Sequence, residues 1–332
     1  MSARPPTGRD VARLAGVSQA VVSLVMSGKS DGRVSTERRE VILKVAQELG
    51  YRPNPAARSL RLGVAHSVAL IVPNVANPFF ASVLLGAERA AREQRYAVML
   101  LDTGEDPNWQ DWVVDVVASR AIDGCIVYAA EPVPATFVRS LGRKVVLVEA
   151  RSRVASTIQL DIAGGTRAAM RHLLDLGHRR IAHLAADYPK ETFRARAAEY
   201  ERSLKEAGVR VRDDYLARAP FEIDEAATAA LRLLSVEPRP TAIFCDDDLL
   251  AAGVYKAARS ASLDIPRNLS VVGFDDIDMA RLLEPELTTV AIPGEAVGRQ
   301  AMLSLLSLVE GGTPTSTTLR LELRVRGSTT RP

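Results

Sequence analysis

Cysteine is scarce in this chain, and long apolar runs are missing. Cys125 and Cys245 are its two cysteines and stand 120 residues apart, with no second metal ligand nearby in sequence. We therefore expect buried thiols in a reducing compartment, not a disulfide or a metal site. No apolar run approaches the roughly 18 to 20 residues that a membrane span needs, and the N-terminal segment MSARPPTGRD lacks the apolar core of a secretory signal. A cytoplasmic protein without a membrane partner is expected.

Common catalytic motifs are missing as well. The sequence has no GxGxxG after a strand, no GxxxxGKS/T and no HExxH, which are the spacings of frequent nucleotide and zinc sites. The four histidines, His66, His172, His178 and His183, are scattered along the chain. We predict that the protein is not an enzyme and uses neither a cofactor nor a metal.

Charge is unevenly distributed, although the formal net charge of the whole chain is only +3. Residues 1–63 hold 11 Lys/Arg against 5 Asp/Glu, whereas the other 269 residues hold 32 against 35. A basic head on a mildly acidic body is typical of a polyanion-binding unit attached to a separate module. A length of 332 residues suggests two to three folded units of roughly 150 residues each.

The basic head contains a helix-turn-helix pattern between Arg9 and Met26. Apolar residues from Val11 onward recur at helical spacing. Gly16 interrupts the pattern, and Ser18 is a good N-cap for a second helix that ends near Met26. Two short helices joined by a tight turn with glycine are typical of this DNA-binding unit, and an ordinary helical hairpin on the surface is the alternative.

A third helix is expected to begin after Ser35 and to end at Gly50. Its apolar stripe can close a small core with the first two helices. The expected core residues are Val11, Leu14, Val22, Val25, Val41, Ile42, Val45, Ala46 and Leu49. The following stretch contains two prolines and then AARSLRL, which is too short to be stably helical alone. It indicates a linker that is helical only with a partner.

From Ser67 onward, apolar strands alternate with amphipathic helices, which is typical of parallel sheets covered on both faces. The expected strands are 68–74, 96–102, 124–130, 144–150 and 156–161, then 179–186, a weak strand near 215–219, 241–247, 269–276 and 288–292. The expected helices include 78–94, 164–176, 194–207, 224–234, 248–260 and 295–310. Two successive series indicate two α/β lobes. A late strand at 319–327 either crosses between the lobes or lies at an edge.

Polar residues stand at the ends of several expected strands. They are Asn77, Asp102, Glu149, Asp161, Asp247 and Asp275. Ligands of open α/β sheets bind beyond the carboxyl ends of the strands. Because two lobes can direct these ends toward a shared cleft, we expect the ligand site there.

Several motifs follow one another along the chain. They are DVARLAGVS (10–18), VSLV (22–25), VSTERREVILKVAQELGYRPN (34–54), ARSLR (57–61), NPFF (77–80), LGHRRIAHL (176–184), VVGFDD (271–276) and LTTV (287–290). In this combination the chain resembles the LacI/GalR family of bacterial transcription regulators over essentially its full length. The resemblance implies an all-α helix-turn-helix head and a periplasmic-binding-protein-like α/β core of two doubly wound parallel-sheet lobes with three crossovers. The expected divisions are a head at 1–53, a hinge helix at 54–63, an N-terminal lobe at 64–162 with 292–320, and a C-terminal lobe at 163–291 with 321–332.

The resemblance places the second helix in the major groove of palindromic operator DNA. The family's base-reading positions fall on Gln19, Ala20 and Leu24. Gln19 can read adenine through two hydrogen bonds, whereas Ala20 and Leu24 offer apolar contact, for instance with a thymine methyl. Leu24 alternatively faces the helix core. Phosphate contacts are expected from Thr7, Arg9, Ser18, Ser23, Lys29 and Arg33, each of which is otherwise an ordinary solvated residue.

The family's hinge maps onto residues 54–63, where Asn54, Ala57, Arg58 and Leu60 are the expected DNA contacts. In the family, paired hinge helices enter the minor groove, and a leucine is wedged into the central base step. Leu60 occupies that position here. The alternative is that Leu60 packs on the core.

By family position, eight residues are expected to bind a small effector in the cleft. They are Asn77, Phe79, Phe80, Glu149, Arg196, Phe221, Asp247 and Asp275. Such a set suits a sugar or polyol, because carboxylates accept from adjacent hydroxyls, a guanidinium donates to sugar oxygens, and phenyl rings stack on apolar faces. Each acid could alternatively cap a neighbouring helix.

Two departures from the family pattern bear on the effector. Many members have Asn-Asp where this chain has Asp247-Asp248, and a Gln of some sugar-responsive members falls near Ile292. Three carboxylates against Arg196 would make the pocket acidic. We expect a neutral, hydroxyl-rich or amine-bearing effector rather than a phosphorylated one.

A two-fold operator requires a two-fold protein, so we expect a homodimer, with candidate faces at 83–95 and 278–284. The predicted function is a nucleoid-associated repressor of sugar or polyol catabolism genes. Its operator affinity would be controlled allosterically by the effector, acting as inducer or corepressor. A cytosolic ligand-binding protein of the sugar-receptor type, without a DNA role, is the alternative.

Overall fold

A computed structural model describes residues 6–28, 30–51, 64–104, 106, 108–119, 121–129, 133–142 and 144–332. The chain divides into two compact units, Met1–Ala65 and His66–Pro332. We refer to the first as the head and to the second as the core.

The head contains three helices, α1 (Gly8–Leu14), α2 (Gln19–Met26) and α3 (Thr36–Glu48). As expected, Ser18 and Ser35 are the N-caps of α2 and α3, and each hydroxyl oxygen accepts a hydrogen bond from a backbone N–H of the first turn. Gly16 has φ +64° in the turn between α1 and α2, and Gly50 has φ +64° after α3. Since this backbone conformation favours glycine, the two residues end their helices where the sequence predicts.

The hydrophobic interior of the head is smaller than expected. Its buried members are Val11, Ala12, Val22, Val25, Ile42 and Ala46. The predictions for Leu14 and Val41 are wrong, because these side chains are 56% and 46% exposed. Both lie on their helices next to buried positions, Val11 and Ile42, so the helical period placed the apolar stripe correctly but made it too wide.

The N-terminal lobe of the core is built on a parallel sheet with strand order β11-β5-β4-β3-β1-β2. The strands are β1 (Ser67–Val72), β2 (Ala97–Asp102), β3 (Cys125–Tyr128), β4 (Val145–Val148), β5 (Ser156–Leu160) and β11 (Ser316–Leu319). Helices α5 (Phe79–Glu93) and α13 (Gly294–Val309) pack on one face, and α6 (Trp109–Ala118) and α7 (Ala135–Ser140) pack on the other. Both faces of β1, β3 and β4 are therefore buried, which explains their continuous apolar sequences.

The C-terminal lobe has a second sheet, with strand order β12-β10-β9-β8-β6-β7. Its strands are β6 (Ile181–Ala186), β7 (Leu216–Ala219), β8 (Ala242–Cys245), β9 (Ser270–Asp275), β10 (Thr288–Ala291) and the antiparallel β12 (Glu322–Arg324). Helices α8 (Ile162–Asp175) and α9 (Glu191–Glu206) cover one face, while α10 (Ile223–Leu234) and α11 (Asp248–Ser260) cover the other. A 3-10 helix (Asp213–Tyr215) and the short α12 (Met279–Leu282) lie in connections.

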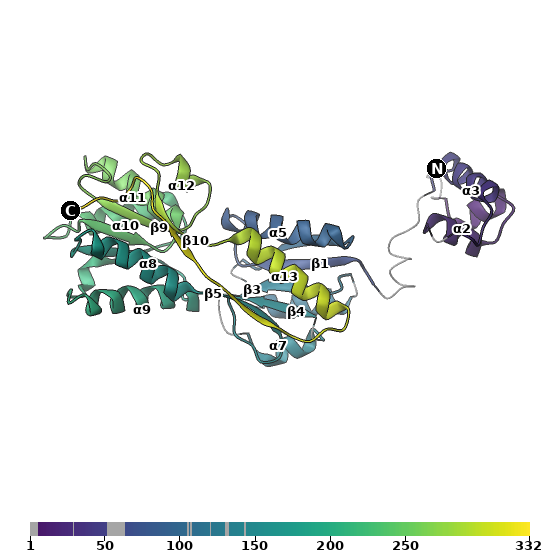
Figure 1. Ribbon diagram of the computed structural model, residues 1–332, viewed down its shortest axis with the longest axis horizontal. Helices are drawn as coiled ribbons and strands as arrows, with labels where there is room; N and C mark the ends of the chain where they lie inside the picture. The colour runs from purple at the N-terminus through teal and green to yellow at the C-terminus, as the bar shows by residue number, and fades with distance from the viewer. Residues whose placement is uncertain are drawn as a thin grey trace. The chain divides into compact units, whose positions relative to one another are not determined.

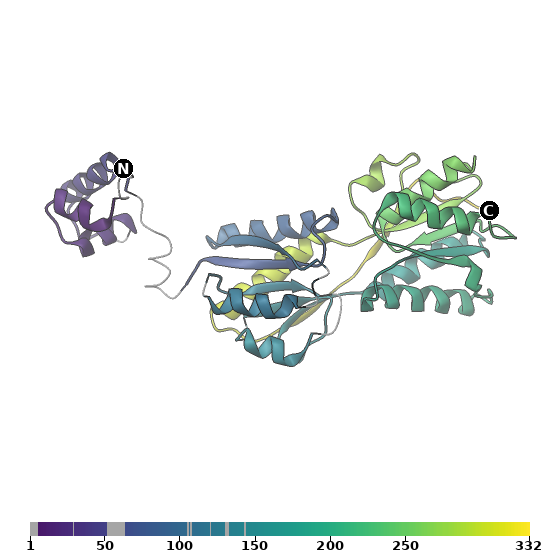
Figure 2. The same ribbon diagram turned by 180° about the vertical axis from the view of Figure 1, so that it is seen from behind.

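Three crossings join the lobes, between β5 and α8, between β10 and α13, and between β11 and β12 (Figures 1 and 2). The expected single strand at 319–327 is wrong in detail. In the structure this segment contains the last residue of β11, a crossing at Arg320–Leu321, and β12. β11 and β12 lie at the edges of different sheets, so the crossing and the edge position, expected as alternatives, both occur.

The helices of the core mostly agree with the expected ranges, but α6, α7 and α12 were not among those predicted. The longest helices, α9 and α13, have 16 residues each. Over the ranges that the structure describes, no helix combines the length and the apolar character needed to cross a membrane. Close approach of α5 and α13 depends on Gly86 and Gly298, because a Cβ at either position would overlap the backbone of the facing helix.

Candidate functional site

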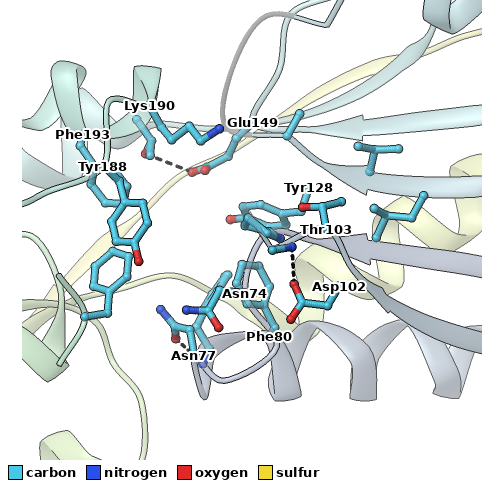
Figure 3. Close-up of a pocket in the computed structure, with 18 of the residues that line it drawn as sticks. Asn74, Asn77, Phe80, Asp102, Thr103, Tyr128, Glu149, Tyr188, Lys190 and Phe193 are labelled. Atoms are coloured by element: carbon cyan, nitrogen blue, oxygen red, sulfur yellow. Dashed lines mark hydrogen bonds between the residues drawn. The ribbon is translucent and has the colours of Figure 1, made fainter. Parts of the chain in front are cut away.

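A pocket of about 730 Å³ opens between the two lobes at the carboxyl ends of both sheets (Figure 3). This volume lies within the range of roughly 300 to 1,000 Å³ typical of small-molecule sites. Every one of the strands β1, β2, β3, β4, β6, β7, β8 and β9 is followed by or ends in a residue that lines it. All eight predicted cleft residues line this pocket: Asn77, Phe79, Phe80, Glu149, Arg196, Phe221, Asp247 and Asp275.

Asp247 caps a helix, which was the alternative left open by the sequence, and it also lines the pocket. It is the N-cap of α11, where its Oδ1 accepts a hydrogen bond of 2.6 Å from the backbone N–H of Leu249. Its Oδ2 accepts a hydrogen bond of 3.2 Å from Asn77 Nδ2, which comes from the other lobe. The side chain therefore caps a helix and also joins both halves of the pocket.

Asp275 ends β9 with φ +111°, a conformation that side-chain-bearing residues rarely adopt. Burial raises the pKa of Asp275 well above its usual range, and the neighbouring charge of Asp247 raises it further. Burial likewise raises the pKa of Asp247, which is hydrogen-bonded to Asp275. Because two close buried carboxyls resist double ionisation, the ionisation of one disfavours the ionisation of the other.

Arg196 supplies a buried positive charge to the pocket, with the residue 3% exposed. Its guanidinium carbon lies 3.7 Å from the ring centroid of Phe274 and 5.0 Å from that of Phe193. Nη2 lies 3.9 Å from Oδ1 of Asp275, and Nη1 donates to the backbone carbonyl of Asp246. The guanidinium thus stacks on aromatic rings while facing a carboxylate.

Glu149 follows β4 and also has a positive φ, +58°. Burial raises the pKa of Glu149 to about 7, against the lowering effects of Arg196 and of the Thr192 hydroxyl. Thr192 Oγ1 donates to Glu149 Oε1 at 3.5 Å, across the cleft from the C-terminal lobe (Figure 3). Glu149 is therefore an acid whose charge changes near physiological pH.

Aromatic rings line both sides of the cleft. Phe79, Phe80 and Tyr128 of the N-terminal lobe contact one another edge to face, with centroids 5.1 to 5.8 Å apart. Across the cleft lies Tyr188 (Figure 3). Its ring stacks on that of Phe221, with centroids 4.9 Å apart and an interplanar angle of 11°. Flat apolar faces beside carboxyl, amide and guanidinium groups suit a ring that carries polar substituents.

The head presents most of its predicted DNA contacts on the surface. Arg9, Ser18, Gln19, Ala20 and Arg33 are exposed, and Thr7, Ser23 and Leu24 are half-buried. Leu24 is not among the residues that pack in the hydrophobic interior of the head. Lys29, Asn54, Ala57, Arg58 and Leu60 lie outside the described residues.

Comparison with known proteins assigns both units. The family description "Bacterial regulatory proteins, lacI family" matches residues 7–54, and "Periplasmic binding protein-like domain" matches residues 170–329. The HTH-type transcriptional repressor CytR of Escherichia coli (strain K12) is 32% identical over 329 residues, which cover 97% of this chain and 96% of CytR. The chain belongs to the LacI family. The repressor PurR of Vibrio campbellii is 33% identical, over 92% of each chain.

Solved structures agree with the LacI-family assignment. The complex of the transcriptional regulator CelR with cellobiose has a TM-score of 0.73 at 28% identity, over 97% of this chain and 99% of CelR. A LacI family transcriptional regulator from Enterococcus faecium with bound ribose has a TM-score of 0.71 at 25% identity, over 80% and 99% of the two chains. The lac repressor dimer on its operator has a TM-score of 0.87 at 22% identity, over 98% and 100%, which shows the shared fold. This LacI-family regulator thus combines a DNA-binding head with an effector-binding type of core.

Several pocket residues of this LacI-family core were not predicted as effector contacts. They include Asn74, Asp102, Trp109, Tyr128, Tyr188, Lys190, Thr192 and Phe193. Asp102 was recognised as a strand-end residue, and the same rule applied to aromatic residues would have found Tyr128, the last residue of β3. Asp161, also a strand-end residue, does not line the pocket and instead caps α8 through Gly164 N at 3.0 Å.

Proposed function

We propose that this protein is a transcriptional repressor whose operator affinity is controlled by a small effector bound between the core lobes. The observation that carries the proposal is the presence, in one chain, of an exposed helix-turn-helix and a pocket between two lobes that is lined by polar and aromatic residues. Binding at two distinct sites in one molecule is the minimum requirement for allosteric control. Acting on DNA would make the protein cytoplasmic and nucleoid-associated.

In this proposal, α2 enters the major groove, with Gln19, Ala20 and Leu24 at base edges. Gln19 and Ala20 are exposed in the first turn of α2, the end of a recognition helix that contacts bases. The proposed phosphate contacts are Thr7, Arg9, Ser18, Ser23, Lys29 and Arg33, and the proposed hinge contacts at 54–63 are Asn54, Ala57, Arg58 and Leu60. Because Ala20 and Leu24 cannot form hydrogen bonds with bases, the hinge contacts and the positioning of the head by phosphate contacts become important for specificity.

We also propose a homodimer that binds a palindromic operator. The structurally similar lac repressor is a dimer on its operator, and a two-fold site needs a two-fold protein. The proposed faces, 83–95 and 278–284, carry exposed apolar side chains: Leu85 is 42% and Leu282 is 80% exposed. A dimer interface over these faces would bury both leucine side chains, which would explain why apolar residues stand at these exposed positions.

The effector is proposed to be neutral and hydroxyl-rich, or amine-bearing, with a sugar or polyol as the first choice. Glu149, Asp247 and Asp275 supply three carboxyl groups for hydrogen bonding, while Arg196 is the buried cation near Asp275. A phosphate group would meet these acids with few cations to balance its charge. CelR is solved with cellobiose and the Enterococcus regulator with ribose, which supports a carbohydrate.

Control would arise from closure of the lobes around the effector. The proposed lobe divisions, 64–162 with 292–320 and 163–291 with 321–332, place the three crossings at the boundaries where such closure would bend the chain. Closure would change the spacing of the two hinges in a dimer. A hinge that is only marginally helical can then switch between a DNA-bound helix and a released segment.

Two measurements test the proposal. A gel shift with a palindromic operator isolated by selection from random DNA should show a specific complex, and its absence would favour the cytosolic sugar-receptor alternative. A thermal-shift screen of sugars, polyols and sugar phosphates should give stabilisation by an unphosphorylated compound. Tight binding of a sugar phosphate by calorimetry would refute the proposed effector class.

A further inference from the structure

His183 on β6 and Asp246, which follows β8 and precedes the pocket residue Asp247, form a buried pair. His183 Nε2 lies 2.8 Å from Asp246 Oδ1, and their side chains are 1% and 0% exposed. Neither residue lines the pocket. A fully buried carboxylate costs stability unless it is hydrogen-bonded, so the pair needs a structural or functional explanation.

Asp246 is held at three points. Oδ1 faces His183 Nε2, Oδ2 accepts a hydrogen bond of 2.9 Å from the backbone N–H of Ala186, and the backbone N–H of Asp246 donates to Leu184 at 3.1 Å. These bonds fix both the side chain and the preceding peptide. Because they anchor the Cα of Asp246 from both sides, they also help to place its carbonyl oxygen, which accepts a hydrogen bond from Arg196 Nη1.

Arg196 depends strongly on that carbonyl. Within the described ranges, the carbonyl of Asp246 is the one hydrogen-bond acceptor of the guanidinium, and Nε has no partner. The other contacts are the faces of Phe193 and Phe274 and the carboxylate of Asp275 at 3.9 Å. Ring faces and a distant carboxylate restrict the guanidinium plane less than a directed hydrogen bond does.

The imidazole also contacts the helix that carries Arg196. Its ring lies 4.9 Å from the ring of Tyr200 and 5.2 Å from that of Phe244. Tyr200 stands one turn after Arg196 on α9, and its hydroxyl donates to the carbonyl of Ile181 on β6 at 2.8 Å. His183 Nδ1 has no hydrogen-bond partner in the part of the chain that the structure describes, so Nε2 is the nitrogen that donates to Asp246.

We propose that His183 and Asp246 are positioning residues for Arg196. They orient its guanidinium toward the pocket through the Asp246 carbonyl and through α9, and so set the affinity for hydroxyl-bearing ligands without touching them. This inference rests on the role of Arg196 as a donor to the effector, which is part of the proposed function. A purely structural pair would stabilise the lobe and leave Arg196 unchanged.

Two substitutions at His183 separate these roles. His183→Phe keeps a ring between Tyr200 and Phe244 but removes the N–H donor to Asp246, whereas His183→Gln keeps a donor at a similar reach. His178→Phe is the matched control, since His178 is another buried histidine of the same lobe, hydrogen-bonded to Thr241, Ser270 and the Thr330 carbonyl. It removes comparable bonds without a contact to Asp246.

The direct measurement is the ¹⁵N–¹H signal of Arg196 Nε in the full-length, perdeuterated protein, assigned by its loss in Arg196→Lys. We expect the same position and slow solvent exchange in the wild type, in His183→Gln and in His178→Phe. In His183→Phe the signal should move and exchange about tenfold faster or more. An unchanged signal in His183→Phe, or an equal change in His178→Phe, would overturn the proposal.

Calorimetry with cellobiose and ribose as probes then tests the effect on binding. For a probe that binds the wild type, His183→Phe should weaken binding about tenfold, and His183→Gln should restore most of it. Equal binding in His183→Phe would overturn the functional part of the proposal. If the Arg196 signal responds as expected but neither probe binds the wild type, the positioning role holds, and cellobiose and ribose are excluded as effectors of the proposed function.

Discussion

Replacement of Glu149 by glutamine tests the electrostatics of the pocket without a ligand. Burial raises the pKa of Glu149 from its ordinary 4.5 to about 7. Glutamine has nearly the same shape and can keep accepting from the Thr192 hydroxyl, which lies 3.5 Å from Oε1. The same positive φ of +58° must be adopted by either residue, so the comparison isolates the ionisable group.

The sign follows from proton linkage. Below pH 4.5 the carboxyl is protonated in both the folded and the unfolded protein, and it causes no electrostatic penalty. Between pH 4.5 and about 7 the unfolded chain loses the proton while the folded protein keeps it, so stability falls as pH rises. Since the pKa rises from 4.5 to about 7, the full penalty above pH 7 is about 3.5 kcal/mol at about 1.4 kcal/mol per pKa unit. Because the side chain is only half-buried, solvent screening reduces this to about 1–3 kcal/mol.

We therefore expect Glu149→Gln to match the wild type near pH 4.5 and to be about 1–3 kcal/mol more stable above pH 7. Unfolding can be followed by the fluorescence of Trp109 and Trp112, which both lie on α6 in the same lobe as Glu149. Glu310→Gln, at an exposed position that ends α13 in the same lobe, is the control and should follow the wild type. Parallel pH profiles for Glu149→Gln and the wild type would refute the reasoning.

Three further predictions concern DNA binding and assembly. Gln19→Ala should weaken operator binding by about 1–3 kcal/mol and relax the preference for adenine at one position, as measured by gel shift. The exposed α3 variant Glu40→Ala is the control. An equal loss of affinity in both variants would contradict a base contact. Leu60→Ala should reduce DNA bending, measured with circularly permuted operator fragments, and unchanged affinity and bending would exclude the minor-groove wedge. Leu282→Asp, at a side chain that is 80% exposed, should convert dimers to monomers in sedimentation. The resulting monomer should remain folded and melt cooperatively. An unchanged dimer would place the interface elsewhere.

Local structure in the head could be predicted well from sequence. Ser18 and Ser35 cap their helices, and Gly16 and Gly50 adopt the positive φ expected of residues that end a helix. These features depend on residues three or four positions apart, so neighbouring residues decide them. The width of the buried apolar stripe cannot be predicted from neighbouring residues in the same way. The exposed side chain of Leu14 shows that the packing of the three helices determines this width.

The pocket shows the same division. Strand-end positions and family motifs predicted that Asn77, Arg196, Asp247 and Asp275 share one cleft, and all four line the pocket. This prediction was possible because parallel strands end at one edge of a sheet. The partner of each side chain could not be predicted, since it comes from distant parts of the chain. Asn77 donates to Asp247 across 170 positions.

The amino-acid sequence by itself determined the helix-turn-helix head, the two α/β lobes and the set of polar residues at the strand ends, because each depends on local periodicity or on a contiguous motif. Only the tertiary structure decided that Asp247 both caps a helix and contacts the opposite lobe, and that burial raises the pKa of Glu149 to about 7. It also revealed His183 and Asp246 behind Arg196. Burial and hydrogen bonding arise between segments far apart in sequence, and they set the charge and orientation of each pocket residue.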